Sequence, residues 1–211
     1  MKQLIDLSTW NRREHFEFFS GFDEPIYGLT AEVDGARAYT RAKELNLPFF
    51  QLYLHATLRA VNQVEALRYR IEDGAVYCYD RINVSATLTR PDNTFAFSFI
   101  PFTESLADFG EGLRAEIEAV NQSTGLRLNE NAARTDVIHF SAIPWIAFTS
   151  LSHARHFQRP DSVPKISVGR YRRQGNTLLM PISVHVHHGL ADGYHVGLFL
   201  EALQQALDSP A

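Results

Sequence analysis

Cysteine, long apolar runs and an excess of positive charge are scarce or absent in this sequence. Its one cysteine, Cys78, has no partner for an internal disulfide, which excludes a disulfide-stabilised secreted scaffold. No stretch approaches the roughly 18 consecutive apolar residues of a membrane-spanning helix, and no apolar run of the signal-peptide kind follows Met1. We therefore expect a cytoplasmic protein with no membrane partner.

The balance of charge excludes another class of partner. Lys and Arg number 20 against 24 Asp and Glu, which gives a formal net charge of -4 at pH 7. The basic residues are scattered, so no region offers the positive footprint that neutralises nucleic-acid phosphates. DNA and RNA are not expected partners.

The spacing of apolar residues predicts an α/β fold. No repeat or linker interrupts the 211 residues, of which 45% are hydrophobic, so we expect one domain over 1–211. Alternation predicts a strand over 27–33, followed by a helix with Asp34 as its N-cap, and a hairpin turn at 72–74. Further strands are expected over 85–89, 94–99, 137–150, 165–171 and 178–188, and helices from Pro48, over 104–120 and near the C-terminus. The expected architecture is a mixed β-sheet flanked by helices.

The most informative stretch is PISVHVHHGLADGYHVGLFL, residues 181–200, where a strand leads through a turn into a helix. Period-two alternation places His188 on the same apolar side of the strand as Ile182, Val184 and Val186. Apolar surroundings favour the neutral imidazole, the form that accepts a proton near neutral pH, so His188 is a candidate general base.

The same stretch contains a His-x-x-x-Asp-Gly pattern over residues 188–193. Asp192 lies four residues after His188, and Gly193 is expected to adopt backbone angles that other residues resist. A core histidine bonded to a backbone carbonyl, beside a solvated turn aspartate, would give the same pattern without any chemistry. The position of the pattern, at a strand end before an amphipathic helix, favours the functional interpretation.

A metal site is a second alternative for this stretch. His185, His187, His188 and His195 lie within eleven residues, and imidazole is a common zinc ligand. Neighbouring His187 and His188 point to opposite faces of a strand, however, and no Cys or Glu completes the set. No metal is therefore expected.

Three separated motifs resemble the chloramphenicol acetyltransferase family. They are TWNRREHFEFF near the N-terminus, SAIPWIAFTS at 141–150 and HHGLADGYHV at 187–196. The resemblance covers nearly the whole chain and implies the fold of CoA-dependent acyltransferases, with sheet and active site shared across a homotrimer. It also implies transfer of an acetyl group from acetyl-CoA to a hydroxyl of chloramphenicol, by direct attack without an acyl-enzyme.

The resemblance assigns roles to individual residues. His188 corresponds to the general base, and Ser141 to the serine that donates to the tetrahedral oxyanion. Asp192 corresponds to an aspartate that pairs with an arginine near the N-terminus, here Arg12. Ser167 corresponds to a threonine that helps to position a water near the oxyanion.

Binding residues follow from the same resemblance. The residues that correspond to the CoA site are Tyr171, Trp145 and Arg170. Those that correspond to the walls of the acceptor pocket are Phe18, Phe19, Phe95, Leu128 and Leu151. The pocket departs from the family pattern, because Leu128 stands where Phe is common and LSHARHFQRP at 151–160 replaces an Asn-rich loop.

Three alternative functions stay open. The acceptor could be another small alcohol or a thiol, or the chain could be a dihydrolipoyl acyltransferase core, which shares the His-x-x-x-Asp-Gly pattern. A third alternative is a protein of the same fold that sequesters a ligand without turnover. The Arg-Arg-Glu-His segment at 12–15 argues against the dihydrolipoyl core, and the joint presence of His188, Ser141, Asp192 and Arg12 argues against mere sequestration.

Overall fold

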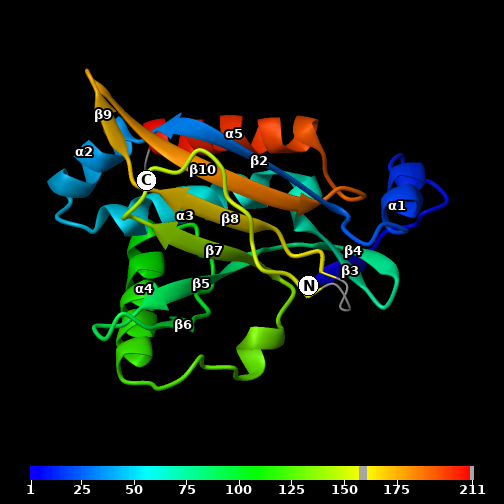
Figure 1. Cartoon of the computed structure of the whole chain (residues 1–211), viewed down its shortest axis with the longest axis horizontal. Coiled ribbons are helices and arrows are strands. Elements are labelled where there is room, and N and C mark those ends of the chain that lie inside the picture. The colour runs from blue at the N-terminus through cyan, green and yellow to red at the C-terminus, as the bar shows by residue number, and fades with distance from the viewer. Residues whose placement is uncertain (157–160, 210–211) are drawn as a thin grey trace.

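The computed structural model describes residues 1–156 and 161–209, and seven of its strands form one main sheet (Figure 1). Along the sheet the order is β2, β10, β8, β7, β5 and β6, and β9 pairs with β10. The strands are β2 (Ile26–Asp34), β5 (Asn83–Thr89), β6 (Phe95–Phe97), β7 (Val137–Ile143), β8 (Lys165–Gly169), β9 (Arg172–Gln174) and β10 (Thr177–His187). β5, β7 and β8 run parallel and the other pairs antiparallel, which confirms the predicted mixed sheet.

A smaller sheet pairs β1 (Lys2–Leu4), β4 (Ala75–Tyr79) and β3 (Tyr69–Glu72) in that order. The turn between β3 and β4 has φ of 51° at Asp73 and 78° at Gly74. Positive φ at both positions matches the twist of a two-residue hairpin, so the predicted turn at 72–74 is confirmed.

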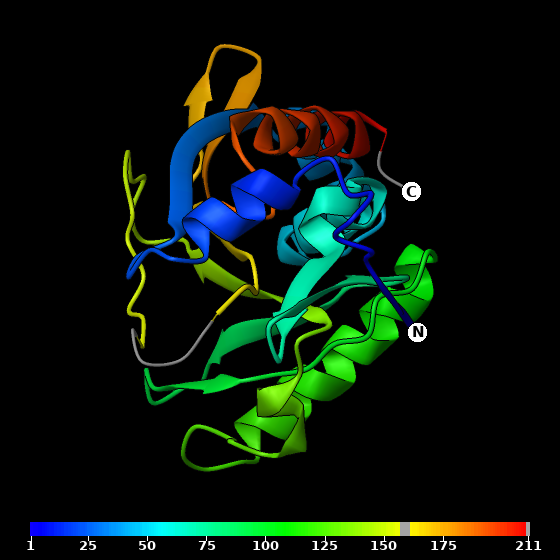
Figure 2. The ribbon, with the colours of Figure 1, turned by 90° about the vertical axis from the view of Figure 1, so that its right-hand side faces the viewer.

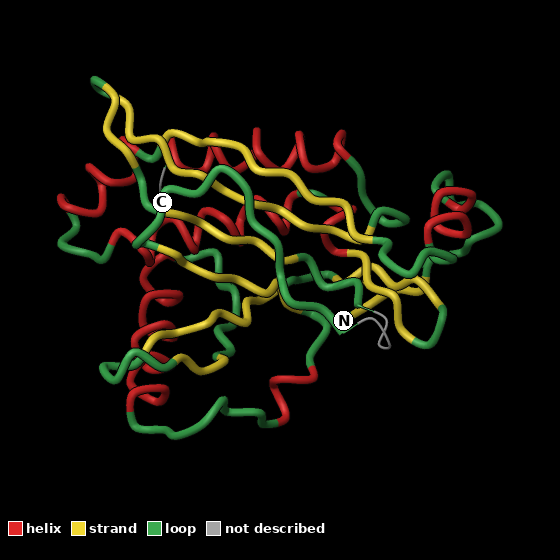
Figure 3. Tube along the Cα trace, viewed as in Figure 1, coloured by secondary structure: helices red, strands yellow, loops and turns green. Residues whose placement is uncertain are grey.

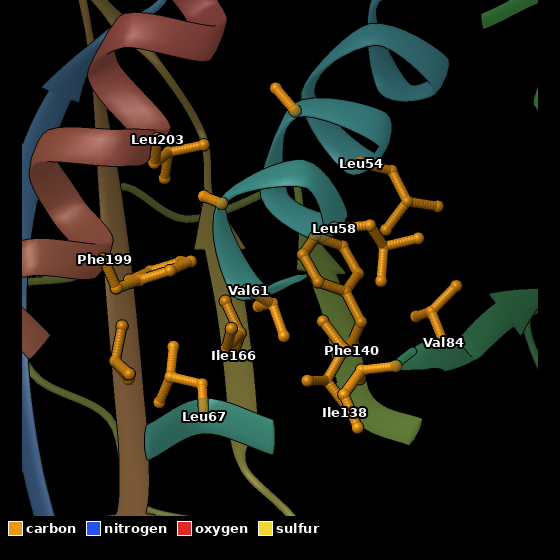
Figure 4. Close-up of a cluster of buried hydrophobic side chains, with 14 of the residues drawn as sticks. Leu54, Leu58, Val61, Leu67, Val84, Ile138, Phe140, Ile166, Phe199 and Leu203 are labelled. Atoms are coloured by element: carbon orange, nitrogen blue, oxygen red, sulfur yellow. The ribbon is translucent and has the colours of Figure 1, made fainter. Parts of the chain in front are cut away.

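Helices cover one face of the main sheet. Those that cover it are α3 (Phe49–Gln63), α4 (Leu106–Asn121) and α5 (Gly193–Asp208). The helix α2 (Ala36–Glu44) packs against α3 and α5, and α1 (Arg13–Phe19) lies beyond the end of the sheet. Short 3-10 turns occur at Glu65–Arg68 and Glu130–Ala133. Figure 4 shows the apolar face of α3 against α5 and the strands, through Leu54, Leu58, Val61, Phe140, Ile166, Phe199 and Leu203. Each such side chain contributes about 1.5–3 kcal/mol on burial, so this layer holds the sheet to the helices. Within the described residues, no helix is long and apolar enough to cross a membrane.

The opposite face of the main sheet is polar and is crossed by a loop, residues 144–156. Figures 1 and 2 both place this loop on the side away from the helices, and Figure 3 shows no helix or strand within it. The Arg170 N–H donates to the Ile146 carbonyl at 2.9 Å, and the His153 ring meets the His185 ring edge-on at 4.9 Å. The loop is therefore attached to β8 and β10 over the polar face.

Some element boundaries differ from the prediction. β7 ends at Ile143 rather than at residue 150, because Pro144 has no N–H to continue the ladder. The N-cap of α2 is Gly35, although the Asp34 carboxylate does accept from the Ala36 N–H at 3.0 Å. The spacing pattern gave no sign of α1, which has seven residues and buries only Phe16.

Candidate active site

His188 lies in the turn just after β10, between aromatic rings from two other elements. The Phe19 ring of α1 stacks on it at 4.1 Å with an interplanar angle of 21°, and the Tyr27 ring of β2 lies 4.9 Å away. The His188 N–H donates to the Pro25 carbonyl at 2.7 Å. β10 ends at His187, one residue short of the predicted strand, so His188 is the first residue of the turn, and Phe19 and Tyr27 supply its apolar surroundings.

A backbone carbonyl sets the tautomer of His188. The Nδ1 atom lies 3.3 Å from the Ala191 carbonyl oxygen. A carbonyl oxygen can only accept, so Nδ1 carries the proton and Nε2 keeps its lone pair. This half-buried imidazole can therefore accept a proton at Nε2.

Arg12 connects the His188 backbone to the start of α5. Its Nη1 donates to the Asp192 Oδ2 at 2.7 Å, and its Nη2 donates to the His188 carbonyl at 3.3 Å. Burial alone would raise the pKa of Asp192, but the hydrogen bonds from Arg12 and His195 lower it to about 2. The carboxylate is thus charged at neutral pH and holds the arginine in place.

Asp192 is also the N-cap of α5. Its Oδ1 accepts from the Tyr194 N–H at 3.1 Å, and the Asp192 N–H lies 3.3 Å from Nδ1 of His195, which is the reciprocal contact of a capping box. The predicted special backbone at Gly193 was wrong, because Gly193 is the first residue of the helix and is not among the positive-φ glycines. A Cβ at Gly193 would instead lie 3.2 Å from the Tyr27 hydroxyl, so close packing accounts for the glycine.

Replacing Asp192 with asparagine is expected to lower both stability and rate. The buried guanidinium of Arg12 loses its charged partner, at a cost of about 1–3 kcal/mol. The His188 backbone then loses a fixed anchor, and kcat should fall by about 10-fold or more. Thermal melts and steady-state kinetics check this, with Asp208→Asn at the far end of α5 as the matched control. Wild-type melting and kcat in Asp192→Asn would count against the role of the pair.

Ser141 and Ser167 lie opposite each other on the parallel strands β7 and β8. The Ser141 hydroxyl accepts from the Thr87 hydroxyl at 3.1 Å, which leaves the Ser141 proton available to a ligand. The Ser167 hydroxyl is buried and has no hydrogen-bond partner among the described residues. Thr87 was missed from the sequence, because only the pairing of β5 with β7 brings it to Ser141.

His188 and Ser141 are far apart within one chain. Ser141 pairs with Ser167, and Ser167 pairs with Ser183, which lies five residues before His188. Strand geometry gives about 16 Å along β10 and about 10 Å across two strand spacings, or roughly 19 Å in all. No single reacting group can contact both side chains of one chain.

The residues matched to the CoA site lie where the strands β7 and β8 end. Trp145 follows β7 and Arg170 follows β8, and the hydrogen bond from the Arg170 N–H to the Ile146 carbonyl joins the two segments. Trp145 is 63% exposed, and the Tyr171 ring lies 5.7 Å from the Tyr39 ring. All three residues thus stand at the carboxyl ends of β7 and β8.

The residues matched to the acceptor pocket do not come together within one chain. Phe19 stacks on His188, and Phe18 lies beside it but is 63% exposed. Phe95 belongs to β6, at the opposite edge of the main sheet from β2, and Leu128 is 71% exposed. Leu151 is half-buried in the 144–156 loop, and residues 157–160 of the same stretch lie outside the described residues.

The comparisons with known proteins cover nearly the whole sequence. A family profile described as chloramphenicol acetyltransferase matches residues 2–204. The chain belongs to the chloramphenicol acetyltransferase family. This confirms the family predicted from the sequence and the class of enzyme, an acetyl-CoA-dependent O-acetyltransferase.

Curated members of the chloramphenicol acetyltransferase family are similar over the same length. The chain is 27% identical over 206 residues to chloramphenicol acetyltransferase 2 of Haemophilus influenzae, covering 97% of this chain and 96% of that protein. It is 29% identical over 205 residues to a chloramphenicol acetyltransferase of a Klebsiella species, covering 97% and 93%.

Solved structures agree with this family, and a more distant one shares the same fold. A chloramphenicol acetyltransferase structure superimposes with a TM-score of 0.91 at 32% identity, covering 98% of this chain and all (100%) of that chain. The dihydrolipoamide acetyltransferase of Azotobacter vinelandii superimposes with a TM-score of 0.69 at 14% identity, covering 87% and 82%. At that identity the second likeness shows a shared fold only.

The clustered histidines do not form a metal centre in the described part of the chain. No group of three or more His, Cys, Asp or Glu side chains is arranged there to hold a metal ion. His187 instead accepts from the Gly189 N–H at its Nδ1, at 3.2 Å, and is 6% exposed. Burial lowers the pKa of His187 to about 4.

Acid is expected to destabilise the protein through His187. An unfolded histidine titrates near 6.5 and the folded one near 4, so the stabilisation is complete above about pH 6.5 and is lost as the pH falls towards 4. At pH 4.5 the loss from this group is about 2–3 kcal/mol. His187→Gln should reduce the difference in unfolding free energy between pH 7 and 4.5, measured with urea at fixed protein concentration. An unchanged pH dependence would contradict the assignment.

Proposed function

We propose that this member of the chloramphenicol acetyltransferase family transfers an acetyl group from acetyl-CoA to a hydroxyl of chloramphenicol or of a similar small molecule. The observation that carries the proposal is the fixed tautomer of His188, whose Nε2 is left as an acceptor while the ring is held between Phe19 and Tyr27. The acetyl-CoA molecule supplies the acetyl thioester, and the residues of this chain provide the acid–base and electrostatic parts of the reaction.

The proposed chemistry is a single direct transfer. Nε2 of His188 takes the proton of the acceptor hydroxyl while the oxygen forms a bond to the thioester carbon. The carbon–sulfur bond then breaks, and the imidazolium returns its proton to the departing sulfur. The products are the acetyl ester and CoA with a free thiol.

Two serines are suited to stabilise the negative charge that develops on the thioester oxygen during this transfer. The Ser141 proton can donate to the oxyanion, because its oxygen already accepts from Thr87. The buried Ser167 hydroxyl, which has no partner among the described residues, would hold a water beside it. Trp145, Arg170 and Tyr171 would hold CoA at the carboxyl ends of β7 and β8.

The separation of about 19 Å between His188 and Ser141 supports a site completed by two chains. A closed homotrimer would repeat one heterologous interface three times and so form three such sites. In this arrangement His188 of one chain faces Ser141 of its neighbour.

Mixed oligomers are expected to recover activity from two inactive variants. If His188→Ala and Ser141→Ala chains are co-expressed and mix at random, about a quarter of the sites receive an intact histidine and an intact serine. Light scattering establishes the trimer, and turnover per site is compared with that of each variant alone. A mixture no more active than the mean of the two variants would contradict a shared site.

Release of CoA thiol tests the function itself. Purified protein is incubated with acetyl-CoA and chloramphenicol, the free thiol is followed by a colorimetric reagent, and the acetyl ester is confirmed by mass spectrometry. Thiol release that depends on the acceptor supports the proposal. Tight binding of chloramphenicol without thiol release would favour sequestration instead.

A further inference from the structure

In the proposed site, CoA and the acceptor lie on opposite sides of Ser141 and Ser167 along the polar face of the sheet. From Ser141 and Ser167, the strands β7 and β8 lead one way to Trp145 and Arg170, the residues matched to CoA. The other way leads towards the amino ends of the same strands. An acceptor that reaches the oxyanion position without overlapping CoA must extend in this second direction.

A row of basic side chains crosses the sheet on the acceptor side. His139 and Lys165 precede Ser141 and Ser167 by two residues, so they share a face with them at a distance of about 7 Å. His139 pairs with Lys165, and Lys165 pairs with His185 of β10. The His153 ring from the 144–156 loop lies against His185 at 4.9 Å. We call His139, His153, Lys165 and His185 the nitrogen cluster.

The nitrogen cluster is polar but carries no net charge. Lys165 is 7% exposed and forms an ion pair with Asp161, and Arg155 of the 144–156 loop forms one with Glu24. Burial lowers the pKa of His153 to about 4 and also lowers that of His185, so both rings are neutral at pH 7. The positive and negative charges that face the cluster therefore cancel in pairs.

One atom of the nitrogen cluster is buried without a partner. The Nε2 of His153 has no hydrogen-bond partner among the described residues. An apolar ring placed here would also shield the Lys165 ion pair and the exposed His139 from water, without offering them hydrogen bonds. A ligand with several hydroxyl groups would satisfy these donors and acceptors, because each neutral imidazole has one of each.

We propose that the preferred acceptor is an uncharged polyhydroxyl compound, such as a sugar or a polyol, whose non-reacting hydroxyls bind the nitrogen cluster. The inference rests on the proposed acetyl transfer and names its acceptor class. A charged acceptor fits less well, because it would have to displace Asp161 from Lys165 or Glu24 from Arg155. Chloramphenicol would react, but with a lower kcat/KM.

An acceptor panel tests this preference. Acetyl-CoA is offered with methyl glucosides, inositol and sorbitol as uncharged polyols, with gluconate and choline as charged hydroxyl compounds, and with chloramphenicol. The best polyol is expected to exceed chloramphenicol in kcat/KM by about 10²-fold, since a site that bonds several hydroxyls disfavours an acceptor that offers fewer of them. A preference for chloramphenicol or for a charged compound would overturn the inference and leave acetyl transfer standing. Failure with every acceptor would overturn acetyl transfer as well.

Two variants link the preference to the nitrogen cluster. His139→Phe changes an exposed side chain, and the double variant Lys165→Met with Asp161→Asn removes both charges of the ion pair together. Each should lower the ratio of kcat/KM for the best polyol to kcat/KM for chloramphenicol by about 10-fold or more. Arg114→Phe, an exposed site on α4, is the matched control for an added surface ring and should leave the ratio unchanged. Equal changes for both acceptors in the two cluster variants would overturn the assignment, because loss of folded protein lowers both activities alike.

Discussion

Replacing His188 with alanine is expected to lower kcat by about 10²–10⁴-fold, the usual contribution of a general base. Folding should change little, because the side chain is half-buried and its hydrogen bond goes to the Ala191 carbonyl. Steady-state kinetics with acetyl-CoA and thermal melts of the same preparations measure the two effects. The rings that flank His188 in the structure are those of Phe19 and Tyr27.

His187→Ala is the control for this result. His187 is chemically identical and adjacent, but its Nδ1 accepts from the Gly189 N–H and its role is structural. We expect a far smaller effect on kcat and a measurable loss of stability. Equal kinetic effects of the two substitutions, or activity that follows His187, would show that the base is wrongly assigned.

Replacing Ser141 with alanine is expected to reduce kcat by about 10²–10³-fold, with the KM for acetyl-CoA near that of wild type. The donor acts mainly when charge develops on the oxygen, so ground-state binding should change little. The Thr87 hydroxyl cannot replace it, because Thr87 lies on β5, one strand further from Ser167.

Thr87→Val separates the two hydroxyls. It removes the hydrogen bond that orients Ser141 but keeps the Ser141 proton, so we expect a smaller loss in kcat than for Ser141→Ala. A Ser141→Ala variant that changed only the KM for acetyl-CoA would refute the oxyanion role.

The sequence predicted the elements whose patterns repeat over many residues. The strand before His188, the helix from Pro48 and the hairpin at 72–74 are all present. The prediction from sequence failed where the apolar pattern was too short or where the structure depended on pairing between distant segments. The helix α1 buries only Phe16, and β7 ends at Pro144 although apolar residues continue beyond it.

The candidate site was predictable as a set of residues but not as an arrangement. The motifs indicated Arg12 and Asp192, and the structure contains their ion pair at 2.7 Å. The neighbours of His188 could not be predicted, because stacking by Phe19 and Tyr27 depends on how α1 and β2 pack against the end of β10. Thr87 and the nitrogen cluster depend on the register between strands, which a single sequence does not display.

The contact between Arg12 and Asp192 joins residues 180 positions apart in the chain. The surroundings of His188 therefore form only when the first and last parts of the chain have met, and loop closure over such a separation is slow compared with local structure. During synthesis the Arg12 guanidinium cannot pair with Asp192 until the start of α5 emerges, so the base is assembled in one of the last folding events. Acetyl transfer is for this reason a sensitive reporter of complete folding, since a partly folded chain would lack its anchored histidine.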